Sequence, residues 1–106
     1  MKTLKKVPVT IKFITDFDDF VANEVENDTL YVSKDSFKMA HNCLCGCGGF
    51  VCIPLQSIDD NGEVSRENNN GWNLSVKDGK ATVTPSILNR PCNGHYIITN
   101  GIANLV

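Results

Sequence analysis

The spacing of its cysteines constrains the fold of this chain more than any other feature of the sequence. Three cysteines alternate with single residues just after His41, and a Cys-x-x-His follows near the other end of the chain. Zinc takes four ligands in a tetrahedron, and cysteine thiolates and histidine nitrogens close its structural sites. We therefore expect one structural zinc ion, held by Cys43, Cys45, Cys47 and Cys92.

The length of the chain gives such a metal a role in folding. A chain of 106 residues is expected to form one domain with a small core, and a bound metal adds directly to its folding free energy. Glycines between and after the cysteines allow the tight backbone turns that converging thiols require. We expect a single zinc-stabilised β domain over residues 1–106, whose two halves are tied together by the metal.

Composition and charge exclude several kinds of partner. Ten basic and twelve acidic side chains give a net charge of -2, without the basic patch that nucleic-acid binding requires. The segment Val7–Phe13 alternates apolar with polar residues, unlike the unbroken apolar run of a signal peptide. No run approaches the roughly 18 apolar residues of a membrane span. We expect no nucleic acid, no membrane, and a cytoplasmic location, where thiols stay reduced.

Alternating apolar residues predict a mainly β fold. Val7, Val9, Ile11 and Phe13 fall on one face of a strand at period two. Segment Lys77–Lys80, which contains Asp-Gly, predicts a hairpin turn. Further strands are predicted at residues 29–33, 50–55, 72–76, 81–84, 95–99 and 102–106. We expect a small antiparallel fold of about six or seven short strands, tied by the metal site.

The remaining segments are predicted to contain no strand. Residues 16–28 are acidic and have little periodicity, residues 34–40 suit one helical turn, and residues 57–71 form a polar loop with two turn signals. Cys52 lies in an apolar stretch, so we expect a buried thiol outside the metal site.

Iron is an alternative to zinc. Rieske centres combine a Cys-x-His with a later Cys-x-x-His to hold a [2Fe–2S] cluster. The segment Cys92–His95 has the spacing of the second half. The first half does not fit, because Cys43-Leu44-Cys45 stands where Cys-x-His is required.

A serine and a histidine outside the four cysteines suggest a second kind of chemistry. A serine hydroxyl is a weak nucleophile unless a base within hydrogen-bond reach takes its proton. Ser86 ends one predicted strand and His95 begins the next, a layout that can bring the two side chains face to face. Asn89 or Asn93 could orient the imidazole, and backbone N–H groups around Asn93 and Gly94 could form an oxyanion hole.

The residues alone leave these roles open. A serine after a proline is commonly a turn residue, and His95 also suits a fourth metal ligand or a structural histidine. His41 suits a metal ligand, a residue that supports one, or a general base. Three functions remain: a serine hydrolase, a non-catalytic zinc module that binds a protein, and a Rieske-like iron–sulfur electron carrier. A zinc hydrolase would further require one open coordination position.

Together these residues resemble a small bacterial and phage family of zinc-binding proteins long regarded as of unknown function. The match covers about residues 29–103. It departs from the family pattern at Cys52, which has no counterpart there, and in lacking the tryptophan that often closes the last strand. The motifs that carry the resemblance are Leu30-Tyr31-Val32-Ser33, residues 41–48, Pro54-Leu55, Trp72-Asn73-Leu74, Pro85-Ser86-Ile87 and residues 92–97.

Many members of that family are encoded beside bacterial ubiquitin-like proteins. The resemblance implies a zinc-stabilised serine peptidase that trims a ubiquitin-like precursor or removes the ubiquitin-like protein from its conjugates. On this chain Ser86 would be the nucleophile, His95 or else His41 the base, and the four cysteines the zinc site. The ubiquitin-like protein or its conjugates would be the partner. Enzymes similar to those that activate and conjugate ubiquitin, encoded nearby, are further candidates.

Overall fold

The described part of the chain is built entirely from strands and turns. The computed structural model describes residues 5–14, 25–44, 49–66, 71–89 and 94–105, which contain ten strands and no helix long or apolar enough to cross a membrane. The strands are β1 (Lys5–Pro8), β2 (Thr10–Ile14), β3 (Thr29–Ser33), β4 (Lys38–Asn42), β5 (Phe50–Asp60), β6 (Glu63–Arg66), β7 (Trp72–Lys77), β8 (Lys80–Asn89), β9 (Gly94–Thr99) and β10 (Ile102–Leu105).

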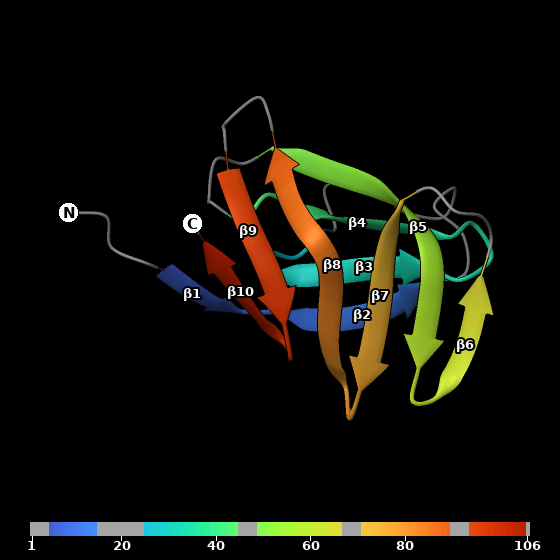
Figure 1. Cartoon of the computed structure of the whole chain (residues 1–106). Coiled ribbons are helices and arrows are strands. Elements are labelled where there is room, and N and C mark those ends of the chain that lie inside the picture. Colours follow the sequence, from blue (N-terminus) through green and yellow to red (C-terminus); the bar gives the residue numbers. More distant parts are fainter. Residues whose placement is uncertain (1–4, 15–24, 45–48, 67–70, 90–93, 106) are drawn as a thin grey trace.

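The ten strands form one mixed sheet that is nearly closed into a barrel (Figure 1). Its order is β1-β10-β9-β8-β7-β5-β4-β3-β2, with β6 paired to β5 off this path. Only Val9 separates β1 from β2, and these two strands are the opposite ends of the path, where β1 pairs with β10 and β2 pairs with β3. The N-terminal segment therefore joins the two ends of the sheet and leaves little free edge there.

The all-β class is confirmed, but the predicted number and direction of strands were wrong. Two of the ladders are parallel, β2 with β3 and β5 with β7. The segment 57–71 is not a loop: β5 continues through its first residues, and β6 pairs back onto β5. Every residue of β6 is exposed, so this strand has no buried face and no apolar alternation that would have revealed it.

Two local predictions were also wrong, and a third falls largely outside the described residues. Residues 34–37 form a turn into β4 rather than a helical turn. Cys52 is exposed, because Val51 and Ile53 on either side of it take the buried positions of β5. Of the acidic segment 16–28, only residues 25–28 are described. By contrast, the predicted hairpin is present, with Lys77 paired to Lys80 and Asp78 and Gly79 at positive φ.

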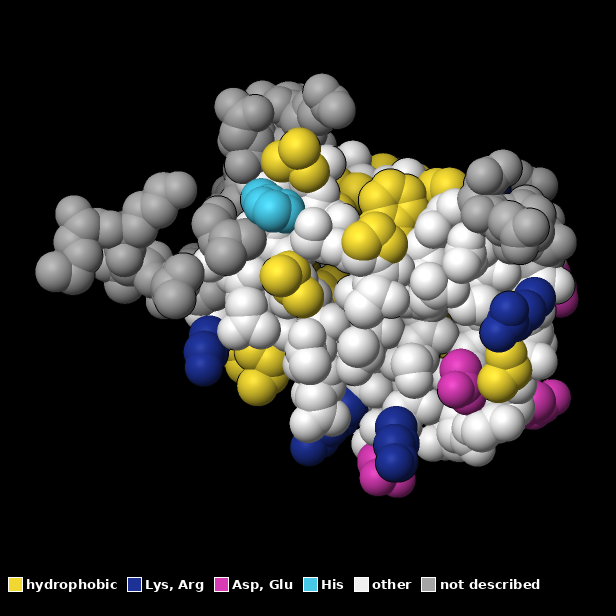
Figure 2. Space-filling model, viewed as in Figure 1, with side chains coloured by type: hydrophobic (Ala, Val, Ile, Leu, Met, Phe, Trp, Pro, Cys, Tyr) yellow, Lys and Arg dark blue, Asp and Glu magenta, His cyan; other side chains and the backbone are white. Residues whose placement is uncertain are grey.

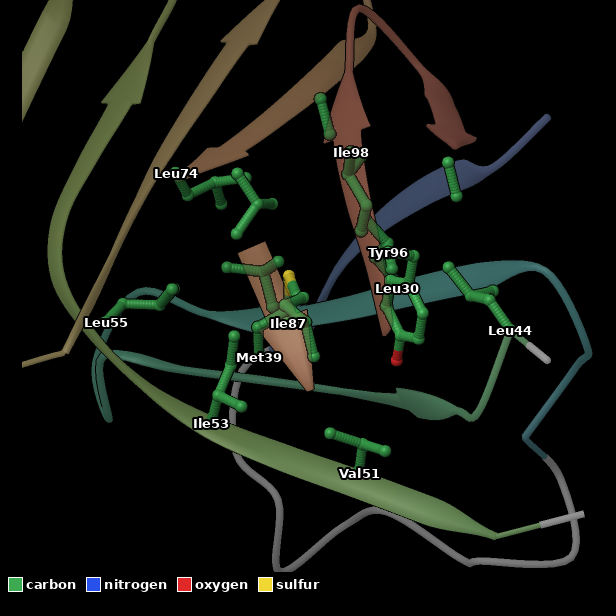
Figure 3. Close-up of a cluster of buried hydrophobic side chains, with 14 of the residues drawn as sticks. Leu30, Met39, Leu44, Val51, Ile53, Leu55, Leu74, Ile87, Tyr96 and Ile98 are labelled. Atoms are coloured by element: carbon green, nitrogen blue, oxygen red, sulfur yellow. The ribbon is translucent and has the colours of Figure 1, made fainter. Parts of the chain in front are cut away.

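The core lies between the two curved halves of the sheet (Figure 3). Ile87 from β8 and Tyr96 and Ile98 from β9 point inward, toward Leu30 and Met39 on the opposite side. All of these side chains are almost completely buried. The inward positions of β8 and β9 therefore carry the stability of the fold, and their outward positions are left for other tasks.

Two neighbouring isoleucines of β9 test this division. Ile98 is fully buried, whereas Ile97 is 40% exposed. We expect Ile98→Ala to lower the free energy of unfolding by about 2–5 kcal/mol, because it leaves a cavity in the core. Ile97→Ala is expected to cost less than about 1 kcal/mol. Urea unfolding followed by circular dichroism measures both values, and equal losses would contradict the assigned faces of β9.

Candidate active site

Ser86 lies at an irregularity in the long strand β8. Between the pairs Val83–Ile98 and Ile87–Tyr96, β8 advances four residues while β9 advances two. Thr84, Pro85 and Ser86 occupy this stretch, so they depart from the regular ladder. The Ser86 side chain is half-buried and is accessible from the outer face of the sheet.

His95 lies next to Ser86 on the outer face of β9. It pairs with Leu88 across the ladder, and its neighbours Gly94 and Tyr96 take the buried positions. His95 Nε2 lies 2.8 Å from Ser86 Oγ. In the tautomer with its proton on Nδ1, Nε2 accepts the hydrogen bond from the serine hydroxyl. This is the geometry in which a histidine can remove the proton of an attacking serine.

Trp72 holds the backbone of Ser86 from the neighbouring strand. Its indole N–H donates a hydrogen bond of 3.2 Å to the Ser86 carbonyl oxygen. The chain reaches this position through Gly71, whose φ is +116° and whose backbone packs closely against Pro54. The sequence placed Trp72 at the start of a predicted strand and in a motif, without a role at the site. Its contact with Ser86 could not be predicted, because it depends on the pairing of β7 with β8.

His41 occupies a different place from Ser86. It is fully buried, and its Nε2 lies 2.6 Å from the Tyr96 hydroxyl oxygen on the inner side of the sheet. Burial lowers the pKa of His41 to about 4, so its ring is neutral at neutral pH. His41 Nδ1 is buried without a hydrogen-bond partner among the described residues. Of the two histidines predicted as bases, only His95 contacts Ser86 in this structure.

The predicted zinc site lies mostly outside the described residues. Cys45, Cys47 and Cys92 are not described, and the described residues contain no group of three or more metal-binding side chains. The part that is described fits a metal. Cys43 is buried, and its backbone N–H donates a 2.7 Å hydrogen bond to the Gly49 carbonyl oxygen, which holds these two residues together.

A second observation agrees with a metal at this end of the sheet. The contact between His41 and Tyr96 brings the end of β4 beside the start of β9. Cys43 follows β4, and Cys92 precedes β9 by two residues. His41 lies in β4 two residues before Cys43, and its buried Nδ1 has the donor chemistry of a zinc ligand or of a group that supports one.

The groups predicted to assist the serine and histidine are only partly described. Gly94 begins β9 and pairs with Asn89, so the two strands stay paired up to this level. Asn93 lies outside the described residues, and only the backbone of Asn89 is described. Among the described residues, the His95 side chain forms a hydrogen bond with Ser86. The third member and the oxyanion hole therefore stay predictions.

The fold and site define an all-β protein with a serine–histidine pair on the outer face of its sheet. The family described as the bacterial ubiquitination-like system serine protease (BubE) matches residues 17–106, and the chain belongs to this family. The resemblance drawn from the motifs is thereby confirmed, and the match extends beyond residues 29–103 on both sides. Comparison with curated proteins and with solved structures gave no match.

Two glycines at positive φ allow a test of the close contact between Gly71 and the Pro54 backbone. A Cβ on Gly71 would lie 2.7 Å from the Pro54 carbonyl oxygen, whereas a Cβ on Gly62, at φ +94°, would meet nothing within 4 Å. Alanine at either position pays for a left-handed backbone. Only Gly71→Ala adds a clash, so we expect it to lower the free energy of unfolding by at least about 1 kcal/mol more than Gly62→Ala. Equal losses in denaturant unfolding would argue against the close approach.

Proposed function

We propose that this protein is a serine peptidase that processes the precursor of a bacterial ubiquitin-like protein or removes that protein from its conjugates. Ser86 is the nucleophile and His95 is the base in this proposal. The observation that carries it is the 2.8 Å distance between Ser86 Oγ and His95 Nε2 on an accessible face. Membership in a family of serine proteases of bacterial ubiquitination-like systems supports it and favours an enzyme over a non-catalytic zinc module.

The chemistry would follow two steps of acyl transfer. Ser86 Oγ attacks the carbonyl carbon of the scissile bond while its proton passes to His95 Nε2. The tetrahedral intermediate then expels the amine, which takes the proton from His95, and an ester remains on Ser86. Water attacks this ester as His95 accepts one of its protons. The ester bond then breaks as His95 gives that proton to Ser86 Oγ, and the ubiquitin-like protein leaves with a free carboxylate. The hydrogen bond from Trp72 to the Ser86 carbonyl limits movement of the nucleophile.

The structural role of zinc belongs to the same proposal. Cys43, Cys45, Cys47 and Cys92 would hold the ion, which would supply a cross-link between two distant parts of the chain rather than take part in the reaction. The buried position of Cys43 supports this assignment. Reduced thiols are consistent with a cytoplasmic protein. The ubiquitin-like substrate is the proposed partner, with activating-like and conjugating-like enzymes as neighbours in the same system.

The nucleophile can be tested with a ubiquitin-like precursor encoded beside the protein. We expect Ser86→Ala to lower cleavage by about a thousandfold or more, because loss of the nucleophile removes the covalent route. The control is Ser75→Ala, which changes an exposed serine on β7. This variant is expected to cleave the precursor at the parent rate. Intact mass spectrometry identifies the products and the scissile bond. Cleavage by Ser86→Ala at the parent rate would refute the assignment.

The metal can be tested by elemental analysis of the purified protein. We expect one zinc per chain in the parent and loss of zinc in Cys43→Ser, with a lower thermal midpoint, because metal binding contributes to folding free energy. Cys52→Ser is the matched control, since Cys52 is exposed and is not a proposed ligand; it is expected to keep its zinc. Iron with visible absorbance that bleaches on reduction would instead support the iron–sulfur alternative.

A further inference from the structure

Two exposed apolar side chains flank Ser86 and His95 on the outer face of the sheet. The ladder pairs Leu88 of β8 with His95 of β9. Ser86 precedes Leu88 by two residues on β8, and Ile97 follows His95 by two residues on β9, so the members of each of these pairs share one face of their strand. The four side chains thus gather on the outer face around the 2.8 Å contact between Ser86 Oγ and His95 Nε2. We call Leu88 and Ile97 the Leu88–Ile97 pair.

The exposure of the Leu88–Ile97 pair is not a consequence of an incomplete core. Leu88 is 50% exposed and Ile97 is 40% exposed, although Ile87 and Ile98 beside them are almost completely buried. The inward positions of both strands are therefore already filled by apolar side chains. An isolated apolar residue on a surface needs no explanation, but two that bracket a serine–histidine pair place an apolar surface where a substrate must lie.

The described residues of β8 and β9 on either side of the pair carry no formal charge, and Lys6 of β1 is separated from Ile97 by Asn104 of β10. Neither the segment Ala81–Leu88 nor β9 contains an aspartate, glutamate, lysine or arginine. Figure 2 shows a histidine side chain between hydrophobic side chains, while most of the coloured charges on this face lie in the lower half of the view. A surface of this kind favours an apolar side chain over an acidic or basic one.

We propose that the Leu88–Ile97 pair forms the contact for an apolar side chain on the acyl side of the scissile bond, in the extended tail of the ubiquitin-like substrate. This inference rests on the proposed function and specifies which part of the substrate the site recognises. The two reactions proposed above share the acyl side, which belongs to the ubiquitin-like protein. They differ in the leaving group, which is a tail peptide in one and a target protein in the other. A contact that serves both must therefore lie on the acyl side.

Two nitrophenyl esters test this contact without knowledge of the natural tail. We compare kcat/KM for p-nitrophenyl hexanoate and p-nitrophenyl acetate, after subtraction of the rate of Ser86→Ala. Each buried methylene raises kcat/KM about fourfold when fully desolvated, so we expect the parent to prefer the hexanoate by about tenfold or more. In the double variant Leu88→Thr/Ile97→Thr, this preference is expected to fall below about threefold, because the longer chain loses its apolar contact.

The matched control removes an exposed valine elsewhere in the same sheet. Val64 is 54% exposed on β6, opposite Asp59 of β5, and is separated from β8 by β5 and β7. We expect Val64→Thr to keep both the rates and the hexanoate preference of the parent. Threonine retains strand propensity at all three positions, and unchanged far-ultraviolet circular dichroism confirms that the variants are folded.

The outcomes separate this inference from the proposed function. If the parent hydrolyses the esters faster than Ser86→Ala does, but the double variant keeps the hexanoate preference, the apolar contact is overturned. The peptidase proposal then still stands. A parent no faster than Ser86→Ala on either ester or on the precursor would overturn the peptidase, and this inference with it. A preference lost equally in Val64→Thr would also overturn the inference, because the effect would then not belong to the pair.

Discussion

The alignment of β8 against β9 is the constraint on which the site depends. Extending the pair Val83–Ile98 without interruption would place Ser86 directly opposite His95, whereas the observed irregularity places Leu88 opposite His95. β8 gains two residues over β9 in this stretch. Because side chains alternate with a period of two, a gain of two keeps every face in place, whereas a gain of one would turn Ser86 into the core.

A second contact links the inside of the barrel to the same strand. His95 and Tyr96 are consecutive in β9, so one faces outward to Ser86 and the other inward to His41. The buried hydrogen bond of 2.6 Å between His41 and the Tyr96 hydroxyl therefore helps to fix the strand that carries His95. Since Cys43 follows His41 by two residues, the first of the proposed zinc ligands is connected to His95 through β4 and β9.

Sequence reasoning succeeded where the signal was local and failed where it depended on distant pairing. The Lys77–Lys80 hairpin follows from an Asp-Gly turn, and its prediction is confirmed. The proximity of Ser86 and His95 followed from two strands joined by a short connection. The parallel ladder of β5 with β7 could not be predicted, because nothing in the sequence of either strand indicates which strand it pairs with. Cys52 was misplaced because an apolar neighbourhood does not tell which of two alternating faces is buried.

The interior of a barrel this small explains why the site lies on its outside. Ile87, Tyr96 and Ile98 point inward and are almost fully buried. The inner face of β8 and β9 is therefore filled by core packing. A substrate can then reach these strands only from the outer face, where water competes with every polar contact. In the proposed substrate contact, apolar side chains beside Ser86 would oppose this competition, because they would exclude water from the bond under attack once an apolar substrate group covers them. The exposed Leu88 and Ile97 would thus serve the chemistry as well as the recognition of the tail.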